Sequence, residues 1–232
     1  MDYTAFLEDL ARLAHRLLTA YDLDETLDDL VASVTRDLGL VGTAVDLADG
    51  DGLRCVTAVP PSLRELAKVQ SSSRGGPALD AYRSRAPRTV ADLAAVEQPW
   101  PDYRAVARRL GLAAVASVPM ALRDETLGVL TLYSDAPRQW SEADLLAASL
   151  MADLATGYFV NSSRLRHQEQ LTSQLQYALE SRVVIEQAKG ITASALGISV
   201  EDAFERLRRH ARSHHTKVRT VAEAVVTLGL RV

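Results

Sequence analysis

The longest helical signal in this sequence is the stretch between Glu142 and Gly190, which contains no proline and only one glycine, Gly157. Proline interrupts helices more reliably than any other residue, so its absence over such a length permits one continuous helix. Ser141 is followed three residues later by Asp144, which is the spacing of a capping box and predicts where the helix begins. We interpret this stretch as a helix that connects two parts of the chain.

The second half of the stretch carries a broken apolar stripe with glutamines between its members. Such a stripe predicts that the helix pairs with a second copy of itself, as a coiled coil in a homodimer. The alternative is a helix that packs only on its own domain. The stripe consists of Leu165, Leu171, Leu175, Leu179 and Ile185.

The chain before this helix alternates between helical and strand patterns. Apolar spacing predicts amphipathic helices at residues 6–18 and 27–38, and the Asp49-Gly50 turn between two β-rich runs predicts a hairpin. The remaining signals are those of a mixed fold. Predicted strands cover residues 41–48, 53–59, 88–93, 114–122 and 127–134; predicted short helices cover residues 62–69, 78–84 and 103–110; residues 71–77 are read as a flexible loop.

The tail after Gly190 is helical. Ser199 and Asp202 cap one predicted helix that runs through Ala211, and a second lies at about residues 216–228. Together with the end of the long helix they predict a small three-helix bundle, which is marginal in size unless it dimerises.

Charge and composition narrow the class of protein. The net charge is −4, yet the segment from Ser162 to Val232 carries 11 Lys and Arg against 7 Asp and Glu, or +4. A mildly basic end on an acidic body fits a module that binds a polyanion. No apolar run approaches the roughly 20 residues of a membrane span, and the first residues lack a secretory signal. Cys55 is the only cysteine, which excludes an internal disulfide, so we expect a cytoplasmic protein.

The tail resembles a known family. It carries Gln187-Ala188-Lys189-Gly190-Ile191, then Gly197-Ile198-Ser199, Ala203-Phe204 and Leu207-Arg208. These spaced elements resemble the ANTAR domain, the RNA-binding output module of transcription antitermination regulators. Two departures are present: Thr192 and Ala193 replace a common Leu-Met pair, and His214, His215 or Thr216 occupies an asparagine-like position. The resemblance implies that a dimer recognises two adjacent hairpin loops in leader transcripts.

The front part of the chain resembles the GAF sensor domain of actinobacterial type. The resemblance rests on Gly76-Pro77-Ala78-Leu79-Asp80, Trp100-Pro101, Val118-Pro119-Met120 and Leu127-Gly128-Val129-Leu130. It implies an α+β fold with a six-stranded antiparallel sheet flanked by helices and a small-molecule pocket on one face. We therefore expect a GAF-like sensor domain over residues 1–161, a connecting helix over 162–178 and a three-helix ANTAR bundle over 179–232.

Both domains supply candidate site residues. Backbone phosphates provide most of the affinity of proteins for RNA, so basic and hydroxyl side chains of the tail are the candidates for RNA contacts. The alternative for each single basic residue is that it belongs to a solvated basic face. Phe204 is expected in the core, which would leave little base stacking. The RNA-binding candidates are Arg182, Lys189, Gly190, Arg208, Thr216, Lys217, Arg219 and Thr220; guesses for the ligand pocket are Tyr82, Trp100, Tyr103 and Tyr133, with Trp100 alternatively a surface anchor.

The sequence gives little support for a catalytic site or a metal site. Cys55 has no histidine near it in sequence, and His15 is the only histidine before the connecting helix. His210, His214 and His215 have the spacing of a zinc pair but no evident third ligand, so we expect neither a metal nor a cofactor. Two function hypotheses remain: a signal-controlled, non-enzymatic RNA-binding antiterminator, and a dimeric scaffold whose tail docks a protein partner.

Overall fold

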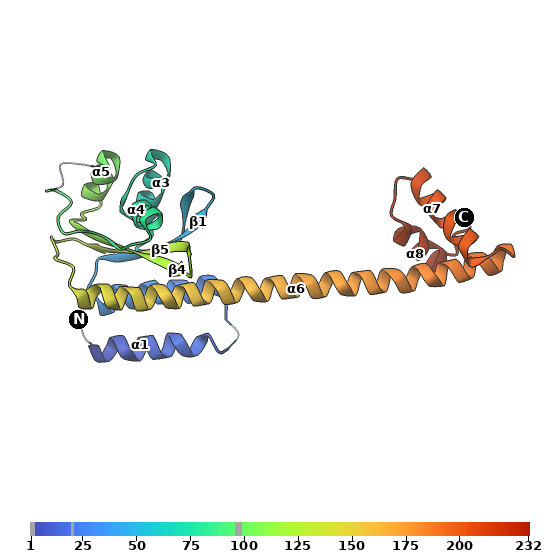
Figure 1. The fold of residues 1–232 in the computed structure, drawn as a ribbon, viewed down its shortest axis with the longest axis horizontal. Coiled ribbons are helices and arrows are strands. Elements are labelled where there is room, and N and C mark those ends of the chain that lie inside the picture. Colours follow the sequence, from blue (N-terminus) through green and yellow to red (C-terminus); the bar gives the residue numbers. More distant parts are fainter. Residues whose placement is uncertain (1–2, 20, 96–98) are drawn as a thin grey trace. The chain divides into compact units, whose positions relative to one another are not determined.

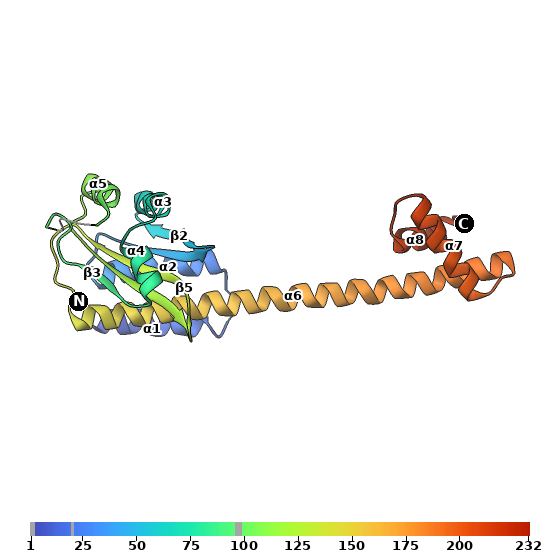
Figure 2. The same ribbon diagram turned by 45° about the horizontal axis from the view of Figure 1, so that its top comes forward.

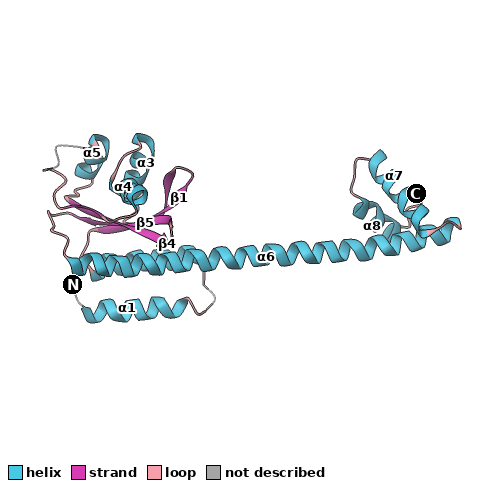
Figure 3. Cartoon of the chain, viewed as in Figure 1, coloured by secondary structure: helices cyan, strands magenta, loops and turns pink. Residues whose placement is uncertain are grey.

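The computed structural model describes residues 3–19, 21–95 and 99–232, and these fall into two compact units (Figure 1). The first unit ends at Ser163 and the second runs from Arg164 to Val232. Figure 3 shows that the strands all belong to the first unit, whereas the second consists of helices and loops.

The first unit is built on an antiparallel sheet in the order β2-β1-β5-β4-β3. The resemblance to the GAF domain implied six strands. Within the described residues the sheet has five, so that expectation is corrected. Along the chain, the connection between β3 and β4 contains α5, which begins at Pro101 and not with a strand. The strands are β1 (Gly42–Asp49), β2 (Gly52–Val59), β3 (Arg88–Val90), β4 (Ala114–Leu122) and β5 (Glu125–Ser134).

Helices cover both faces of this sheet (Figure 2). One face packs against α1, α2 and the first turns of α6 through side chains such as Val45, Leu130 and Leu132. The other face is covered by α3 and α5, with α4 beside them. The helices are α1 (Tyr3–Arg16), α2 (Leu23–Asp37), α3 (Arg64–Ser73, preceded by the 3-10 turn Pro61–Leu63), α4 (Pro77–Ser84), α5 (Pro101–Arg109) and α6 (Glu142–Leu196).

Local sequence signals explain where several elements begin and end. Ser141 Oγ accepts the Asp144 amide and Asp144 Oδ2 accepts the Ser141 amide, both at 3.1 Å, so the predicted capping box opens α6. The expected loop at 71–77 is wrong in its first half, because α3 continues to Ser73. Arg74 then turns the chain in the left-handed region, at φ 53°.

The second unit comprises the last part of α6 with α7 (Val200–Ser213) and α8 (Val218–Leu228). Gly190 does not interrupt α6, which ends at Leu196 before Gly197 in the left-handed region. Ser199 Oγ accepts the Asp202 amide at 3.0 Å and caps α7 as predicted. The core of this unit is small and consists of Ala188, Leu207, Ala211, Val221, Ala222 and Val225.

One window of α6 is apolar enough to invite comparison with a membrane span. Its 18 residues reach a mean hydropathy of 1.3, and half of the window is buried inside the protein. Met151, Ala152 and Ala155 of α6 belong to the core beneath the sheet. Packing in the first unit thus accounts for the buried half of the window.

Candidate functional sites

Lys189 lies on the surface of the second unit where α6 meets α7. Its Nζ lies 2.9 Å from Glu186 Oε1 and 5.4 Å from the centre of the Phe204 ring, and its side chain is only 17% exposed. The Arg208 guanidinium also lies over this ring, at 5.7 Å, and pairs with Glu205 at 2.8 Å. We call these five residues the Phe204 cluster. It places an aromatic ring beside two cations, each paired with a glutamate, so the five residues together carry no net charge.

Phe204 differs from its sequence-based expectation. Its side chain is half-buried and lies outside the core of the second unit, although the apolar spacing of α7 placed it in the core. The spacing could not distinguish a core position from a half-buried one, because Phe204 follows Ala203 at the edge of the apolar face of α7. A half-buried aromatic ring with cations over it is suited to stacking on an unpaired base.

Arg219, another candidate, has a different environment. Its guanidinium donates to Glu223 at 2.7 Å, to Ser181 Oγ at 2.9 Å and to the Tyr177 carbonyl oxygen at 3.2 Å. Glu180 lies 3.5 Å away, and the guanidinium is stacked 4.1 Å above the Tyr177 ring. The hydrogen bond to Glu223 and the nearby negative charges raise the pKa of Arg219. This side chain links α8 to α6, so its donors are engaged within the protein.

The remaining RNA candidates are exposed. Arg182 lies on α6, and Thr216, Lys217 and Thr220 lie together at the start of α8, where Lys217 is the N-cap residue. Gly190 is also exposed, and a Cβ at its position would meet no atom within 4 Å. The structure thus places both Lys189 and Arg208 beside Phe204, whereas Arg219 is bonded to other residues of the protein. No packing contact in this chain requires glycine at position 190.

Two histidines at the end of α7 contact each other. The rings of His210 and His214 are stacked at 4.1 Å, and His215 adopts a left-handed conformation in the turn before α8. Among the residues that the structure describes, no group of three or more His, Cys, Asp or Glu could hold a metal ion.

The second part of α6 exposes an apolar stripe. Leu175 and Leu179 are 67% and 66% exposed, and Val183 continues the stripe. Ile185, predicted to belong to this stripe, instead packs on the core of the second unit, because it lies on the other side of the helix. The exposed members, which we call the α6 stripe, are Leu165, Leu171, Leu175, Leu179 and Val183.

In the first unit, three of the four guessed pocket residues come together. Trp100, Tyr103 and Tyr133 are buried in one cluster between the sheet and helices α3 and α5, with the Trp100 and Tyr103 rings 6.3 Å apart. Trp100 is therefore not a surface anchor. Tyr82 packs in a separate cluster with α4 residues, away from the other three.

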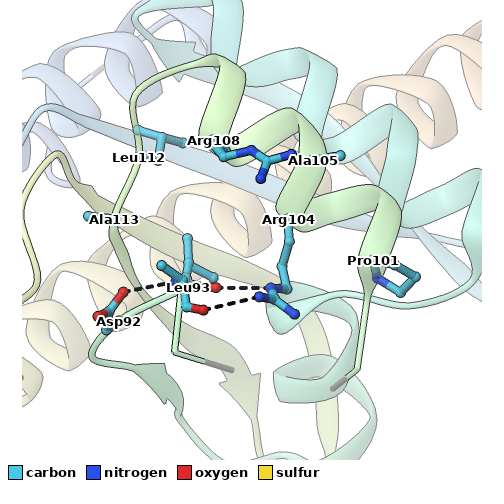
Figure 4. A pocket seen from close by; sticks show the side chains of 9 residues that line it. Asp92, Leu93, Pro101, Arg104, Ala105, Arg108, Leu112 and Ala113 are labelled. Carbon is cyan, nitrogen blue, oxygen red and sulfur yellow. Dashed lines mark hydrogen bonds between the residues drawn. The ribbon is translucent and has the colours of Figure 1, made fainter. Parts of the chain in front are cut away.

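The described part of this unit carries two hollows that none of the four aromatic residues lines. One, of about 340 Å³, is shown in Figure 4. There Arg104 donates to the carbonyl oxygens of Leu93 and Ala94 at 2.9 and 3.2 Å, which fixes the loop beside α5. The other, of about 610 Å³, is the β2–α3 hollow; its lining includes Asp49, Leu53, Arg54, Cys55, Arg64, Ala67, Lys68, Ser71 and Ser72.

Polar groups are buried beside the aromatic cluster. Asp46 of β1 is 2% exposed, and burial raises its pKa to about 6. Burial, followed by the charge of Asp46, raises the pKa of Cys55 on β2 to about 12. Burial also raises the pKa values of Tyr103 and Tyr133, and the charge of Asp46 adds to both shifts. Sequence reasoning missed Asp46, which reads as an ordinary polar residue of an alternating strand.

Comparison with known families decides what these two units are. The GAF domain model matches residues 22–157, which is more than half of the chain, and the ANTAR domain model matches residues 173–226. The chain belongs to the GAF family and ends in an ANTAR domain. These matches confirm the GAF and ANTAR resemblances that the sequence indicated. The sheet with its flanking helices confirms the α+β fold class. A GAF domain followed by an ANTAR domain is a sensory and regulatory architecture.

Solved structures share the fold of this GAF–ANTAR protein at low identity. The GAF domain from an Acinetobacter phosphoenolpyruvate-protein phosphotransferase is 14% identical with a TM-score of 0.56, over 72% of this chain and 99% of that one. Free methionine-R-sulfoxide reductase from Neisseria meningitidis, solved with its substrate, is 18% identical with a TM-score of 0.56, over 71% and 95%. No match was found among curated proteins. These likenesses concern the GAF fold alone.

Proposed function

We propose that this GAF–ANTAR protein is a non-enzymatic cytoplasmic regulator that binds RNA through its ANTAR domain under control of its GAF domain. The Phe204 cluster carries the proposal. Lys189 and Arg208 supply hydrogen-bond donors for the edges of unpaired bases, and the half-buried Phe204 ring between α6 and α7 supplies a stacking surface. Unpaired bases of a hairpin loop are read by stacking and hydrogen bonding, so a loop fits this surface better than a duplex.

The α6 stripe supports a homodimer as the RNA-binding form. Leu175, Leu179 and Val183 are more than half exposed in the single chain, and a hollow of about 580 Å³ opens along them. Leu171, Leu175, Leu179 and Val183 recur every four residues along one side of the helix, and such an apolar stripe is buried when two helices pair. Pairing through the stripe brings two ANTAR domains onto one RNA. This matches tandem hairpin loops in a leader transcript, and stabilising such hairpins prevents a terminator from forming.

A gel-shift titration tests this function with the intact protein. The RNA carries two adjacent hairpins, and a second RNA has the same stems with scrambled loops. We expect tight binding of the first RNA, weaker binding of the second, and loss of the preference in Lys189→Gln and Arg208→Gln.

Arg209→Gln is the matched control, because it removes the same charge from α7 one residue beyond Arg208. It should lower affinity for both RNAs alike, as a phosphate contact does. Equal binding of both RNAs by the wild-type protein would contradict loop recognition. It would favour the second reading, a dimeric scaffold whose tail docks a protein.

A further inference from the structure

The ANTAR domain contains a hollow of about 370 Å³ between the end of α6 and residues 229–232, which follow α8. A hollow of this size is large enough to hold a small molecule. Its walls are largely apolar and are open to solvent, since Ile191 is 46% and Leu230 is 36% exposed. We call it the Thr192 hollow; α6 contributes Ile191, Thr192, Ala195 and Leu196 to its lining, and the segment after α8 contributes Leu230 and Arg231.

The Thr192 hydroxyl is an unpaired polar group in the wall of this hollow. The residue is only 5% exposed, and its hydroxyl forms no hydrogen bond within the described residues. Other hydroxyls of α6 behave differently, because Ser149 and Thr156 each donate to the carbonyl oxygen four residues earlier, at 2.8 Å. A buried polar group without a partner costs free energy, so the Thr192 hydroxyl points to a partner that comes from outside the chain.

Positive charge lies at the mouth of the Thr192 hollow. Arg231 belongs to the lining, is exposed and forms no ion pair within the described part of the chain. Arg206 of α7 lies beside the same segment, since its Nε donates to the Val232 carbonyl oxygen at 3.2 Å. The described lining residues include no Asp or Glu. The charges therefore favour a ligand with an anionic end over one with a cationic end.

We propose that the Thr192 hollow binds a small carboxylic acid. Its apolar body lies between α6 and α8, its carboxylate pairs with Arg231, and a hydroxyl or keto oxygen on the body bonds to the Thr192 hydroxyl. The site gives the ANTAR domain a ligand of its own, apart from any ligand of the GAF domain. It shares no lining residue with the Phe204 cluster or the α6 stripe, so the inference goes beyond the proposed function and does not rest on it.

Methyl NMR of the full chain tests the proposal, because its three isoleucines all lie in the ANTAR domain. Ile191 lines the hollow, whereas Ile185 packs on the core and Ile198 follows Gly197 in the turn before α7. The probe is para-hydroxyphenylacetate, whose aromatic ring shifts the resonance of a methyl group that it contacts. Three matched compounds serve as comparisons: phenylacetate lacks the hydroxyl, tyrosol lacks the carboxylate, and tyramine carries an ammonium group in place of the carboxylate.

We expect saturable shifts of the Ile191 methyl resonance with para-hydroxyphenylacetate, at a Kd on the order of 1 mM or below, and no binding of tyramine. Arg231→Gln should weaken this binding by up to about fivefold, as for an exposed ion pair, and should leave tyrosol binding unchanged. Thr192→Val keeps the shape of the side chain. It should remove the preference of about two- to tenfold for para-hydroxyphenylacetate over phenylacetate.

Ala195→Leu places a larger side chain in an exposed part of the wall and should abolish the shifts, whereas Ser194→Leu, an exposed neighbour outside the lining, should not. The proposal is overturned if the Ile191 resonance does not respond to para-hydroxyphenylacetate, or if Ala195→Leu binds it like wild type. It is also overturned if either Thr192→Val or Arg231→Gln leaves the affinities unchanged. Ile191 shifts that follow protein concentration and not the probe would contradict it as well, and would assign the hollow to a contact between copies of the chain.

Discussion

The stability of the GAF domain should depend on pH through Asp46. Burial raises the pKa of this carboxyl from 3.8 to about 6 in the folded protein. The folded state therefore binds the proton more tightly than the unfolded state. The stabilising contribution is fully present below pH 3.8 and is lost as the pH rises through 6. Because one pKa unit corresponds to about 1.4 kcal/mol, the loss is on the order of 3 kcal/mol.

Asp46→Asn isolates this contribution, because asparagine is neutral at every pH. Other carboxyls act in the opposite sense; the pKa of Asp144, for example, is lowered although burial opposes this, because Arg138 and Ser141 bond to it. The quantity to compare is therefore the stability of the variant minus that of wild type. We expect this difference to move in favour of the variant by about 2.5 kcal/mol between pH 4 and pH 8.

Urea unfolding followed by tryptophan fluorescence measures this difference at each pH. Asp49→Asn is the control, since it removes a carboxylate of the same hairpin that is exposed to solvent. A difference between Asp46→Asn and wild type that is the same at pH 4 and pH 8 would refute the reasoning. It would mean that Asp46 is paired or solvated in the folded domain.

Three further predictions concern the ANTAR domain. Gly190→Ala should stabilise this domain by up to about 1 kcal/mol in thermal unfolding, because alanine favours an exposed helix and its Cβ meets no atom there. The same change should weaken RNA binding in a gel shift if RNA approaches the helix at this point. Arg219→Met should lower the midpoint of helix melting seen by circular dichroism more than Arg209→Met, because it unties α8 from Tyr177 and Ser181 on α6; equal midpoints would show that the link contributes nothing. Leu179→Glu should shift the protein toward monomer in light scattering, and an unchanged mass would show that the α6 stripe is not the dimer contact.

The element pattern of this chain could be predicted from sequence because strong local signals mark it. The capping box at Ser141 and Asp144, the Asp49-Gly50 hairpin and the Ser199 cap all form as expected. These signals act over a few residues, so they survive without knowledge of the tertiary fold.

Features that depend on what covers a surface could not be predicted in this way. Asp46 alternates with Val45 and Leu47, which is the pattern of a polar side chain facing water. It is buried because α3 and α5 cover the second face of the sheet. Phe204 shows the converse, since its place on the apolar side of α7 predicts burial but the small ANTAR core leaves its ring at the surface beside Lys189.

The central claim, that the ANTAR domain reads RNA loops through the Phe204 cluster, is tested most directly by the ratio of two affinities. These are the Kd values of the intact protein for the two-hairpin RNA and for a duplex of the same stems without unpaired loop bases, measured for wild type and for Phe204→Leu at one salt concentration. Stacking on an aromatic ring contributes about 1–3 kcal/mol per unpaired base, so we expect a wild-type preference of about five- to 150-fold for the hairpins that Phe204→Leu largely removes. The same ratio in both proteins would contradict the account.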